Sequence, residues 1–477
     1  MKYIKLYYLL LIHSFFGCVS HSQELSKNAL LEDLNFFEKA IQAGHPITLN
    51  KAWTNALRPF IDSLSESENN DLTPFEYEWE IRKALSLTGC AHTVIKASPL
   101  GEKYRNQIGE NIFLPFRFYG DTSGLYMIEG KGPEKGSDPE FPVKIVSING
   151  VSAKEIMEPM LNYQSADGYQ KTLGYAIVNK YAHILIRRQF VGTDDFTMQY
   201  IDKNGALSVY KFKAVDEYAP GGFQYFQPKS EPLLSEHHIG LYVLDPNSMY
   251  LSIQSMDYPD YASLNERIFS RIMLENTQNL VIDLRNNGGG TPKSALDLLS
   301  YFMSDTLSQI DIRPNGNVSK FLNSKIKLIG VWLWDKITPH HRTDGGTAYV
   351  TNVTYPKSWQ YRGKVYILTN GLTLSSACTL TAYLKHGVGG VSIGQETGGG
   401  ESGCNANSFQ TLVLPNSKVS IQFPLFRFDH QISIPDNHHG IRPDYPVSYD
   451  VHSYMSNRDL EMLKVLELIN GSAHYKK

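Results

Sequence analysis

Apolar residues recur every three or four positions in the first part of the chain, over residues 30–41 and again over 53–64. This spacing is typical of amphipathic helices that bury one face. Thr73-Pro74 has the residue types of a helix start, and the third helix is expected to run to about Leu87. The pattern predicts a small N-terminal helical domain over residues 24–95.

The pattern then changes to short runs of β-branched and aromatic residues separated by turn residues, which is typical of strands. The predicted strands are 112–119, 125–128, 143–148, 197–201 and 207–212. The strand at 143–148, its Ile-Asn-Gly turn and the helical pattern at 153–161 together resemble a PDZ domain, which binds peptide termini at a strand edge. We predict a PDZ-like β-rich domain over 96–218, with a generic β-domain as the alternative.

After a Gly/Pro-rich linker, apolar strands and helices alternate, which predicts an α/β core over 236–471 with a mixed sheet. Its strands are expected near 250, 281 and 365, with helices at 264–274, 378–385 and 460–469. A hairpin is expected over 412–423, whereas 305–362 has no clear period and is predicted to be an irregular lid or subdomain. The fold class is therefore α/β in its core and α+β as a multi-domain whole.

Composition and charge narrow the functional classes. A chain of 477 residues is too long for one core, and its formal net charge of -3 gives no basic footprint for nucleic acid. Its histidine doublets lack ligand spacing, and paired-cysteine and His-Glu-x-x-His patterns are absent. We predict no metal site and no cofactor, and the oligomeric state stays open.

The N-terminus reads as an export signal. Lys2 and Lys5 precede a short apolar run at 6–12, followed by small and polar residues. That run is too short to span a bilayer, so we predict a signal peptide over 1–22 and a location in the periplasm or cell envelope. Cleavage near Ser22 is one possibility, and a lipoprotein signal with lipidated Cys18 is the other.

Two stretches of the core carry candidate chemistry. The buried strand near 281 leads into Asp-Leu-Arg-Asn-Asn-Gly-Gly-Gly at 283–290, whose glycines allow a loop of oxyanion-binding N–H groups. The strand near 367 is followed by Thr373-x-Ser-Ser-Ala377, where a helix is expected to begin. A serine at the positive end of a helix is well placed to act as a nucleophile.

These motifs, with Gly394-x-Glu-Thr-Gly and Gly440-Ile-x-Pro-Asp444 after them, resemble the S41 peptidases in kind and in order. This is the C-terminal processing, or tail-specific protease, and tricorn-core family, and the resemblance covers roughly the last half of the chain. It implies a serine peptidase acting on peptides or proteins, with a core of crotonase/ClpP-like ββα units. It also implies Ser376 as nucleophile, with Ser375 as fallback, and N–H donors from Ala377 and from Gly289 or Gly288.

The residue that acts as general base distinguishes two branches of the family. The Ser/Lys branch carries a lysine in the stretch that matches 394–401, where this chain has none, and the nearest lysines are Lys385 and Lys418. The tricorn-like branch uses histidine, and Gly89, His92 and Thr93 match its motif, although Cys90 and Ala91 depart from it. The resemblance therefore implies His92 as base. Its orienting acid is predicted to be Asp436, with Glu401 and Asp429 as alternatives.

Two further questions stay open at this level. Some S41-like folds bind apolar ligands without proteolysis, so a weak or inactive envelope protein that binds peptides or apolar ligands is the alternative function. If His92 meets the nucleophile, Cys90 and Cys378 come into one neighbourhood, either as a disulfide or as two buried thiols. Cys404 is a competing partner for Cys378.

Overall fold

The computed structural model describes residues 26–49, 56–67, 72–101, 109, 111–130, 139–322, 336–343, 345–432, 434 and 438–474. The predicted signal peptide and Cys18 lie outside these residues, as does Asp436. Among the described helices, none has a stretch long and apolar enough to cross a membrane.

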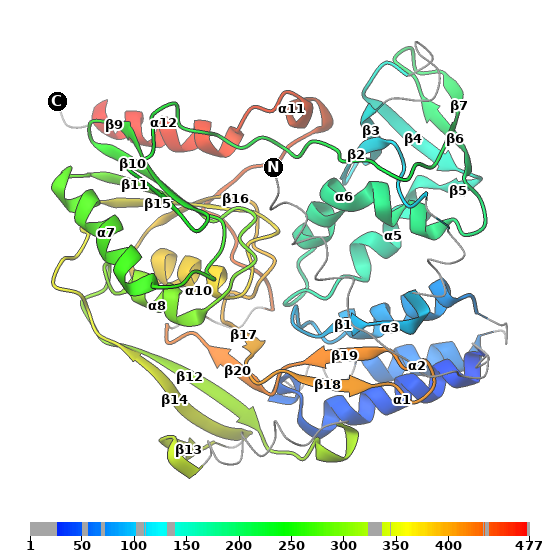
Figure 1. The fold of residues 1–477 in the computed structure, drawn as a ribbon, viewed down its shortest axis with the longest axis horizontal. Coiled ribbons are helices and arrows are strands. Elements are labelled where there is room, and N and C mark those ends of the chain that lie inside the picture. Colours follow the sequence, from blue (N-terminus) through cyan, green and yellow to red (C-terminus); the bar gives the residue numbers. More distant parts are fainter. Residues whose placement is uncertain are drawn as a thin grey trace.

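The N-terminal helices do not form a core by themselves. Their inward apolar residues share one cluster with side chains from 318–322 and 412–426. The strand that follows them, β1, pairs antiparallel with β19, and β19 pairs with β18. Figure 1 shows this hairpin lying beside the helices α1–α3. The elements are α1 (Lys27–Gly44), η1 (Pro46–Leu49), α2 (Leu57–Glu66), α3 (Pro74–Ser86), β1 (Val94–Ala97), β18 (Gln410–Val413) and β19 (Ser420–Phe423).

The β-rich region is a sheet in the order β2-β3-β4-β6-β7, with β5 paired to β4 and the helices α5 and α6 packed on it. The predicted strand–turn–helix unit is present as β4, β5 and α5. The elements are β2 (Phe116–Asp121), β3 (Gly124–Gly130), β4 (Val143–Ile148), β5 (Val151–Ser152), α5 (Ala153–Asn162), α6 (Thr172–Leu185), η2 (Arg187–Gln189), β6 (Asp195–Ile201) and β7 (Leu207–Lys213).

The core is a seven-stranded mixed sheet in the order β21-β16-β15-β11-β10-β9-β8. β10, β11, β15 and β16 run parallel, which confirms the predicted sheet. Helices α7, α8 and α10 cover one face and α12 covers the other, so the central strands are buried on both sides. The elements are β8 (Leu234–Glu236), β9 (Ile239–Asp245), β10 (Ser248–Ile253), α7 (Tyr261–Leu274), β11 (Asn279–Asp283), α8 (Pro292–Leu299), β15 (Lys364–Thr369), α10 (Ser376–Ala382), η4 (Tyr383–Gly387), β16 (Val391–Gly394), β21 (Tyr445–Pro446), α11 (Val451–Met455) and α12 (Leu460–His474).

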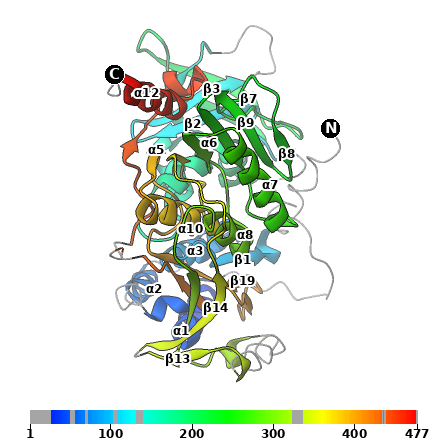
Figure 2. The ribbon, with the colours of Figure 1, turned by 90° about the vertical axis from the view of Figure 1, so that its left-hand side faces the viewer.

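The region 305–362, predicted to be irregular, instead contributes to a second sheet in the order β13-β14-β12-β20-β17. β12 and β14 form a long antiparallel pair that extends away from the core, at the same end of the molecule as α1 and α2 (Figure 2). Burial alternates along β12, but its buried positions include Gln309 and Asp311, so the strand lacks a clean apolar–polar alternation. β20 pairs with one edge of β12, and η1 packs on it. The elements are β12 (Leu307–Pro314), η3 (Ser319–Phe321), β13 (His340–Arg342), β14 (Gly346–Thr354), β17 (Gly403–Ala406) and β20 (Phe426–Asp429).

Candidate active site

Ser375 occupies the strained turn between β15 and α10. It is the residue directly before the helix, and its backbone has φ 52° and ψ -127°. A positive φ is uncommon for a residue with a side chain, and such strain persists only where surrounding contacts hold it. Those contacts come from the preceding turn, where the Thr373 hydroxyl donates to the Leu284 carbonyl at 2.9 Å and accepts from the Asn370 N–H at 3.1 Å.

His92 reaches this serine from the other end of the chain. Its Nε2 lies 3.2 Å from the Ser375 Oγ, which is a hydrogen bond between residues 283 positions apart. The imidazole is half-buried and stacks on Phe409, with ring centroids 5.7 Å apart. The strand β1 begins two residues later and fixes the approach of His92 through its pairing with β19.

Ser376 is placed differently from the sequence prediction. Its side chain is 3 % exposed, and its Oγ donates to the Gly290 carbonyl at 3.2 Å. The structure therefore brings His92 to Ser375, the fallback, and holds Ser376 in the first turn of α10. The two serines are equivalent by motif, and the backbone turn at Ser375 directs their side chains apart.

The predicted oxyanion donors are also committed elsewhere. The Gly289 N–H donates to the Asn287 side chain at 2.9 Å, and the Ala377 N–H donates to the Leu374 carbonyl at 3.1 Å. Within the described part of the chain, the N–H groups of Ser376 and Gly288 are left without a protein acceptor. If Ser375 is the nucleophile instead of Ser376, the N–H group expected to bind the oxyanion is that of Ser376 instead of Ala377.

The glycine loop lies directly behind the nucleophile. A β-carbon added to Gly289 would lie 2.6 Å from the Ser375 Cβ and 3.1 Å from the Ser376 nitrogen. Only glycine permits this approach, and the φ of Gly289 is +94°. The backbone of the Asn-Asn-Gly-Gly-Gly motif is therefore held against the backbone that presents Ser375.

Asp167, which sequence reasoning missed, lies beside His92. Its carboxylate is 5 % exposed and accepts from the Ala91 N–H at 2.8 Å and from the Gly400 N–H at 3.3 Å. Burial raises the pKa of Asp167, and the nearby His92 opposes that shift. No motif surrounds Asp167 in the sequence, since it lies in a loop of the β-rich region.

The second nitrogen of His92 has no hydrogen bond. Nδ1 is buried and lacks a partner within the described residues. Potential ligand atoms of His92, Asp167 and Cys90 all lie within 4.8 Å of one another. Buried polar atoms are almost always paired, so an unpaired one in this position calls for a functional explanation.

The other predicted side chains contact different partners. Glu401 accepts from His386 at 2.9 Å, and Asp429 is paired with Arg427. Asp436 lies outside the described residues. The contacts of the two candidate lysines also differ from those of a catalytic base, since Lys385 pairs with Asp444 at 3.1 Å and Lys418 donates to Pro415 at 2.6 Å.

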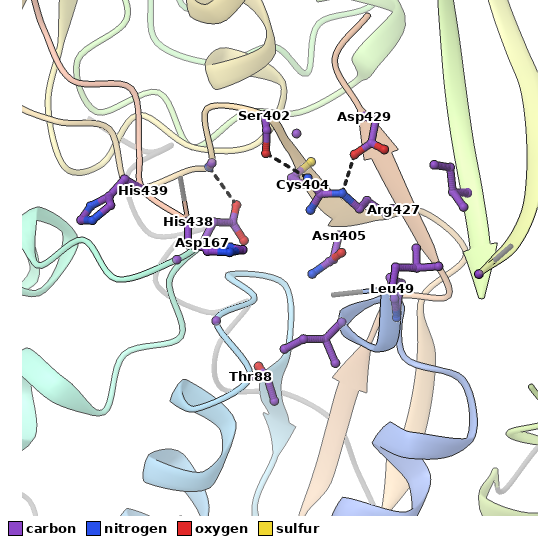
Figure 3. Close-up of a pocket in the computed structure, with 18 of the residues that line it drawn as sticks. Leu49, Thr88, Asp167, Ser402, Cys404, Asn405, Arg427, Asp429, His438 and His439 are labelled. Atoms are coloured by element: carbon purple, nitrogen blue, oxygen red, sulfur yellow. Dashed lines mark hydrogen bonds and ion pairs between the residues drawn. The ribbon is translucent and has the colours of Figure 1, made fainter. Parts of the chain in front are cut away.

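A cavity of about 440 Å³ opens beside Asp167. Figure 3 shows Asp167 on one side of it, with Asn405 and the Arg427–Asp429 pair opposite and Thr88 below. The Asn405 side-chain oxygen is buried without a partner among the described residues. The walls of this cavity are therefore largely polar.

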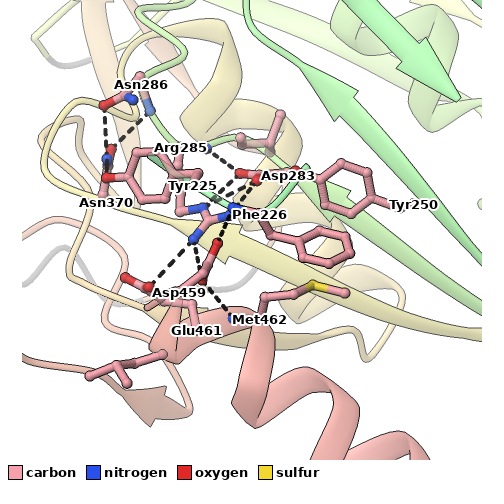
Figure 4. Close-up of polar contacts among 12 residues, drawn as sticks. Tyr225, Phe226, Tyr250, Asp283, Arg285, Asn286, Asn370, Asp459, Glu461 and Met462 are labelled. Atoms are coloured by element: carbon pink, nitrogen blue, oxygen red, sulfur yellow. Dashed lines mark hydrogen bonds and ion pairs between the residues drawn. The ribbon is translucent and has the colours of Figure 1, made fainter. Parts of the chain in front are cut away.

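Asp283 and Arg285, the charged residues of the glycine-loop motif, point away from the serine. Arg285 lies in a buried cluster with Asp283 at 2.6 Å, Asp459 at 2.8 Å and Glu461 at 3.4 Å, shown in Figure 4. Its guanidinium also lies 4.1 Å from the Tyr225 ring centroid. This charge anchors the loop to the start of α12.

The three described cysteines are free and buried. The Cys90 thiol contacts the Asn405 carbonyl at 3.9 Å, and the Cys378 thiol contacts the Thr373 carbonyl at 3.1 Å. Burial chiefly raises the pKa of Cys404, and Asp167, Cys378 and Cys90 add to the shift. The thiols thus occupy one neighbourhood without a disulfide, as in the second of the two arrangements expected.

The core of the chain matches a known family model, and its fold is similar to solved structures. The family model described as "Peptidase family S41" matches residues 247–447. The structure of mature CPAF is similar over 93% of this chain and 98% of its own, with a TM-score of 0.62 and 14% identity. CPAF complexed with lactacystin gives a TM-score of 0.61 and 14% identity over 93% and 99% of the two chains. No curated protein matches the sequence.

Proposed function

This chain is a serine peptidase of family S41, and we propose that it cleaves internal peptide bonds by forming an acyl-enzyme on Ser375. The observation that carries the proposal is the 3.2 Å contact between the His92 Nε2 and the Ser375 Oγ. A nucleophile within hydrogen-bonding reach of its base is the geometric requirement for this chemistry.

In the proposed reaction, the Ser375 oxygen attacks the scissile carbonyl while its proton passes to the His92 Nε2. The carbonyl oxygen becomes negative and is bound by the N–H groups of Ser376 and Gly288, which have no other acceptor among the described residues. The imidazolium then gives its proton to the leaving amine. A water molecule then gives a proton to His92 and attacks the acyl-enzyme. The bond to the Ser375 oxygen breaks, the acyl group leaves as a carboxylic acid, and the proton held by His92 restores the Ser375 hydroxyl.

Asp167 is proposed as the acid that orients His92, in place of Asp436, Glu401 and Asp429. A carboxylate beside the unpaired Nδ1 would hold the ring in one tautomer and stabilise the positive charge that forms during attack. The two N–H bonds from Ala91 and Gly400 keep this carboxylate in place despite its burial. The triad would then come from the N-terminal region, the β-rich region and the core.

Labelling with a fluorophosphonate tests the nucleophile. The probe should modify Ser375 in the wild type and in Ser376→Ala, and it should modify nothing in Ser375→Ala. Mass spectrometry of the labelled peptide distinguishes the two serines. Labelling of Ser376 would instead move the nucleophile to that residue. No labelling of a folded wild type would favour the alternative of an S41-like protein that binds peptides or apolar ligands.

The CPAF complex with lactacystin suggests a second probe. If the serine chemistry is shared, lactacystin should compete with the fluorophosphonate for Ser375. The Ser376→Ala variant is the matched control, because it removes the neighbouring hydroxyl and keeps the proposed nucleophile.

Export and lipid anchoring remain part of the proposal and rest on the sequence of residues 1–22. Fractionation of cells that express the full chain should find the protein in the envelope. Replacement of Cys18 by serine should release it from the membrane fraction if Cys18 is lipidated. A wild type that is already absent from the membrane fraction, and that this replacement leaves unchanged, would instead favour cleavage near Ser22.

A further inference from the structure

Three metal-binding side chains converge at the proposed base. Cys90, His92 and Asp167 each contribute one ligand atom, and these atoms lie within 4.8 Å of one another. Tetrahedral Zn²⁺ with ligand distances of about 2.0–2.3 Å places its ligands roughly 3.5 Å apart, so small inward movements of the side chains would complete the site. We propose that Cys90, His92 and Asp167 bind a Zn²⁺ ion that inhibits the peptidase.

The unpaired nitrogen of His92 supplies the second observation. Nε2 contacts Ser375, whereas Nδ1 is buried and has no hydrogen bond to any residue that the structure describes. A neutral imidazole with its proton on Nε2 offers the Nδ1 lone pair to a metal. Zn²⁺ at this position would give the buried nitrogen a partner and would prevent His92 from working with Asp167.

The surroundings hold the ligands in place. Asp167 accepts from the N–H groups of Ala91 and Gly400, and Cys90 contacts the Asn405 carbonyl. Such outer contacts orient metal ligands and support affinity. The cavity of about 440 Å³ is lined by Asp167 and by Gly89, the neighbour of Cys90, so it lies beside the proposed site (Figure 3).

The chemical types of the three ligand atoms indicate which metal ion the site would bind. One thiolate, one imidazole and one carboxylate suit Zn²⁺, whereas Mg²⁺ and Ca²⁺ prefer sites made of oxygen atoms. Cys90 would bind as a thiolate, so each bound ion releases the thiol proton to solvent. Binding should therefore weaken as the pH falls.

Co²⁺ is the direct probe, because thiolate ligation to Co²⁺ produces a charge-transfer absorption band in the near ultraviolet. The wild-type full-length protein should show this band at one Co²⁺ per chain, and added Zn²⁺ should abolish it. Cys90→Ser should lack the band and bind Zn²⁺ at least about 100-fold more weakly, since losing a ligand exceeds the usual effect of losing an outer contact.

Cys404→Ser is the matched control. Cys404 is also a buried thiol, and it lines the same cavity, but it is outside the ligand trio. This variant should keep the Co²⁺ band and the wild-type Zn²⁺ affinity. Absence of the band in the wild type, or its loss in Cys404→Ser with retention in Cys90→Ser, would overturn the proposal. Circular dichroism confirms folding, and Cys90→Ala serves if the serine variant does not fold.

Inhibition rests on the proposed function, whereas the Co²⁺ band does not. Zn²⁺ should inhibit wild-type peptide hydrolysis, EDTA should restore it, and Cys90→Ser should keep basal activity while its inhibition requires at least tenfold more Zn²⁺. A band without any peptidase activity would support the metal site and reject the proposed function. Equal inhibition of wild type and Cys90→Ser would reject inhibition through this site.

Discussion

Two groups of buried charged residues lie on either side of the same glycine loop, and they differ in how completely they are paired. Arg285 has carboxylate partners from Asp283, Asp459 and Glu461 and a ring contact from Tyr225. On the other side, His92 keeps one nitrogen unpaired, and the serine it contacts has a strained backbone.

This difference in pairing indicates that the Arg285 cluster anchors the loop, whereas the His92 site is suited to chemistry. A fully paired ionic cluster is rigid and has no group left over for a substrate. A site that must bind developing charge needs unoccupied donors and a base with a free path to its proton. Both Asp283 and Arg285 belong to the same sequence motif as the loop, yet they anchor it, whereas Gly289 of the loop lies against Ser375.

The sharpest test of the comparison replaces each serine separately. Ser375→Ala should lower kcat by about 10⁶-fold, the scale for loss of a serine nucleophile. Ser376→Ala should stay within about tenfold of the wild type, because its hydroxyl only donates to Gly290. Steady-state hydrolysis of a peptide substrate measures both, and the reverse order of effects would restore the sequence-based assignment.

The next largest effect is expected for the carboxylate beside His92. Asp167→Asn should lower kcat by about 10²- to 10⁴-fold with little change in KM, because the amide cannot stabilise the imidazolium that forms during attack. Glu401→Gln is the control, since Glu401 pairs with His386 and should be nearly neutral for catalysis. A parallel loss in both variants would point to general destabilisation.

Breaking the paired cluster should affect stability first. Arg285→Met leaves three carboxylates without their cation, and loss of one partner from a buried ionic cluster costs about 3–5 kcal/mol. The midpoint of urea unfolding should fall accordingly. Activity per fluorophosphonate-reactive molecule should fall much less than in Asp167→Asn. A stable but inactive Arg285→Met would show that this cluster serves chemistry more than anchoring.

The smallest effect is a pH dependence of stability at Glu461. Burial raises its pKa from 4.5 to about 7, so the folded protein binds this proton more tightly than the unfolded chain. Its contribution is full below about pH 4.5 and is lost as the pH rises through 7. Glu461→Gln, which stays neutral, should remove up to about 3 kcal/mol of this decline. Urea unfolding between pH 4.5 and 8 measures it, and an unchanged slope would contradict the assignment.

The sequence predicted those parts of the fold that depend on local pattern. The strands near 250, 281 and 365 are almost wholly apolar because helices cover both faces of their sheet, and this signal requires no knowledge of distant partners. The long pair β12–β14 was missed because the elements that contact β12, at 46–49 and 426–429, are distant in the sequence. Its buried positions also include the polar residues Gln309 and Asp311.

The residues of the candidate site also differ in whether the local sequence could identify them. His92 and the Ser-Ser pair carry recognisable motifs, but the choice between Ser375 and Ser376 depends on one backbone angle that both residues could adopt. Asp167 approaches His92 only through the folding of the β-rich region against the core. Its sequence neighbours Ala166 and Gly168 give no catalytic signal, so a motif search has nothing to detect.

The pairing of β1 with β19 also bears on when this enzyme becomes active during its synthesis. The strand after His92 has its partner at Ser420–Gln422, and the carboxylate of Asp33 accepts from the N–H groups of Asn416 and Ser417. A ribosome produces the histidine long before these partners exist. Since part of the apolar cluster that the N-terminal helices share comes from residues 412–426, a nascent or truncated chain that ends before 410 has His92 without this support. We therefore expect hydrolysis only once nearly the whole polypeptide has been made.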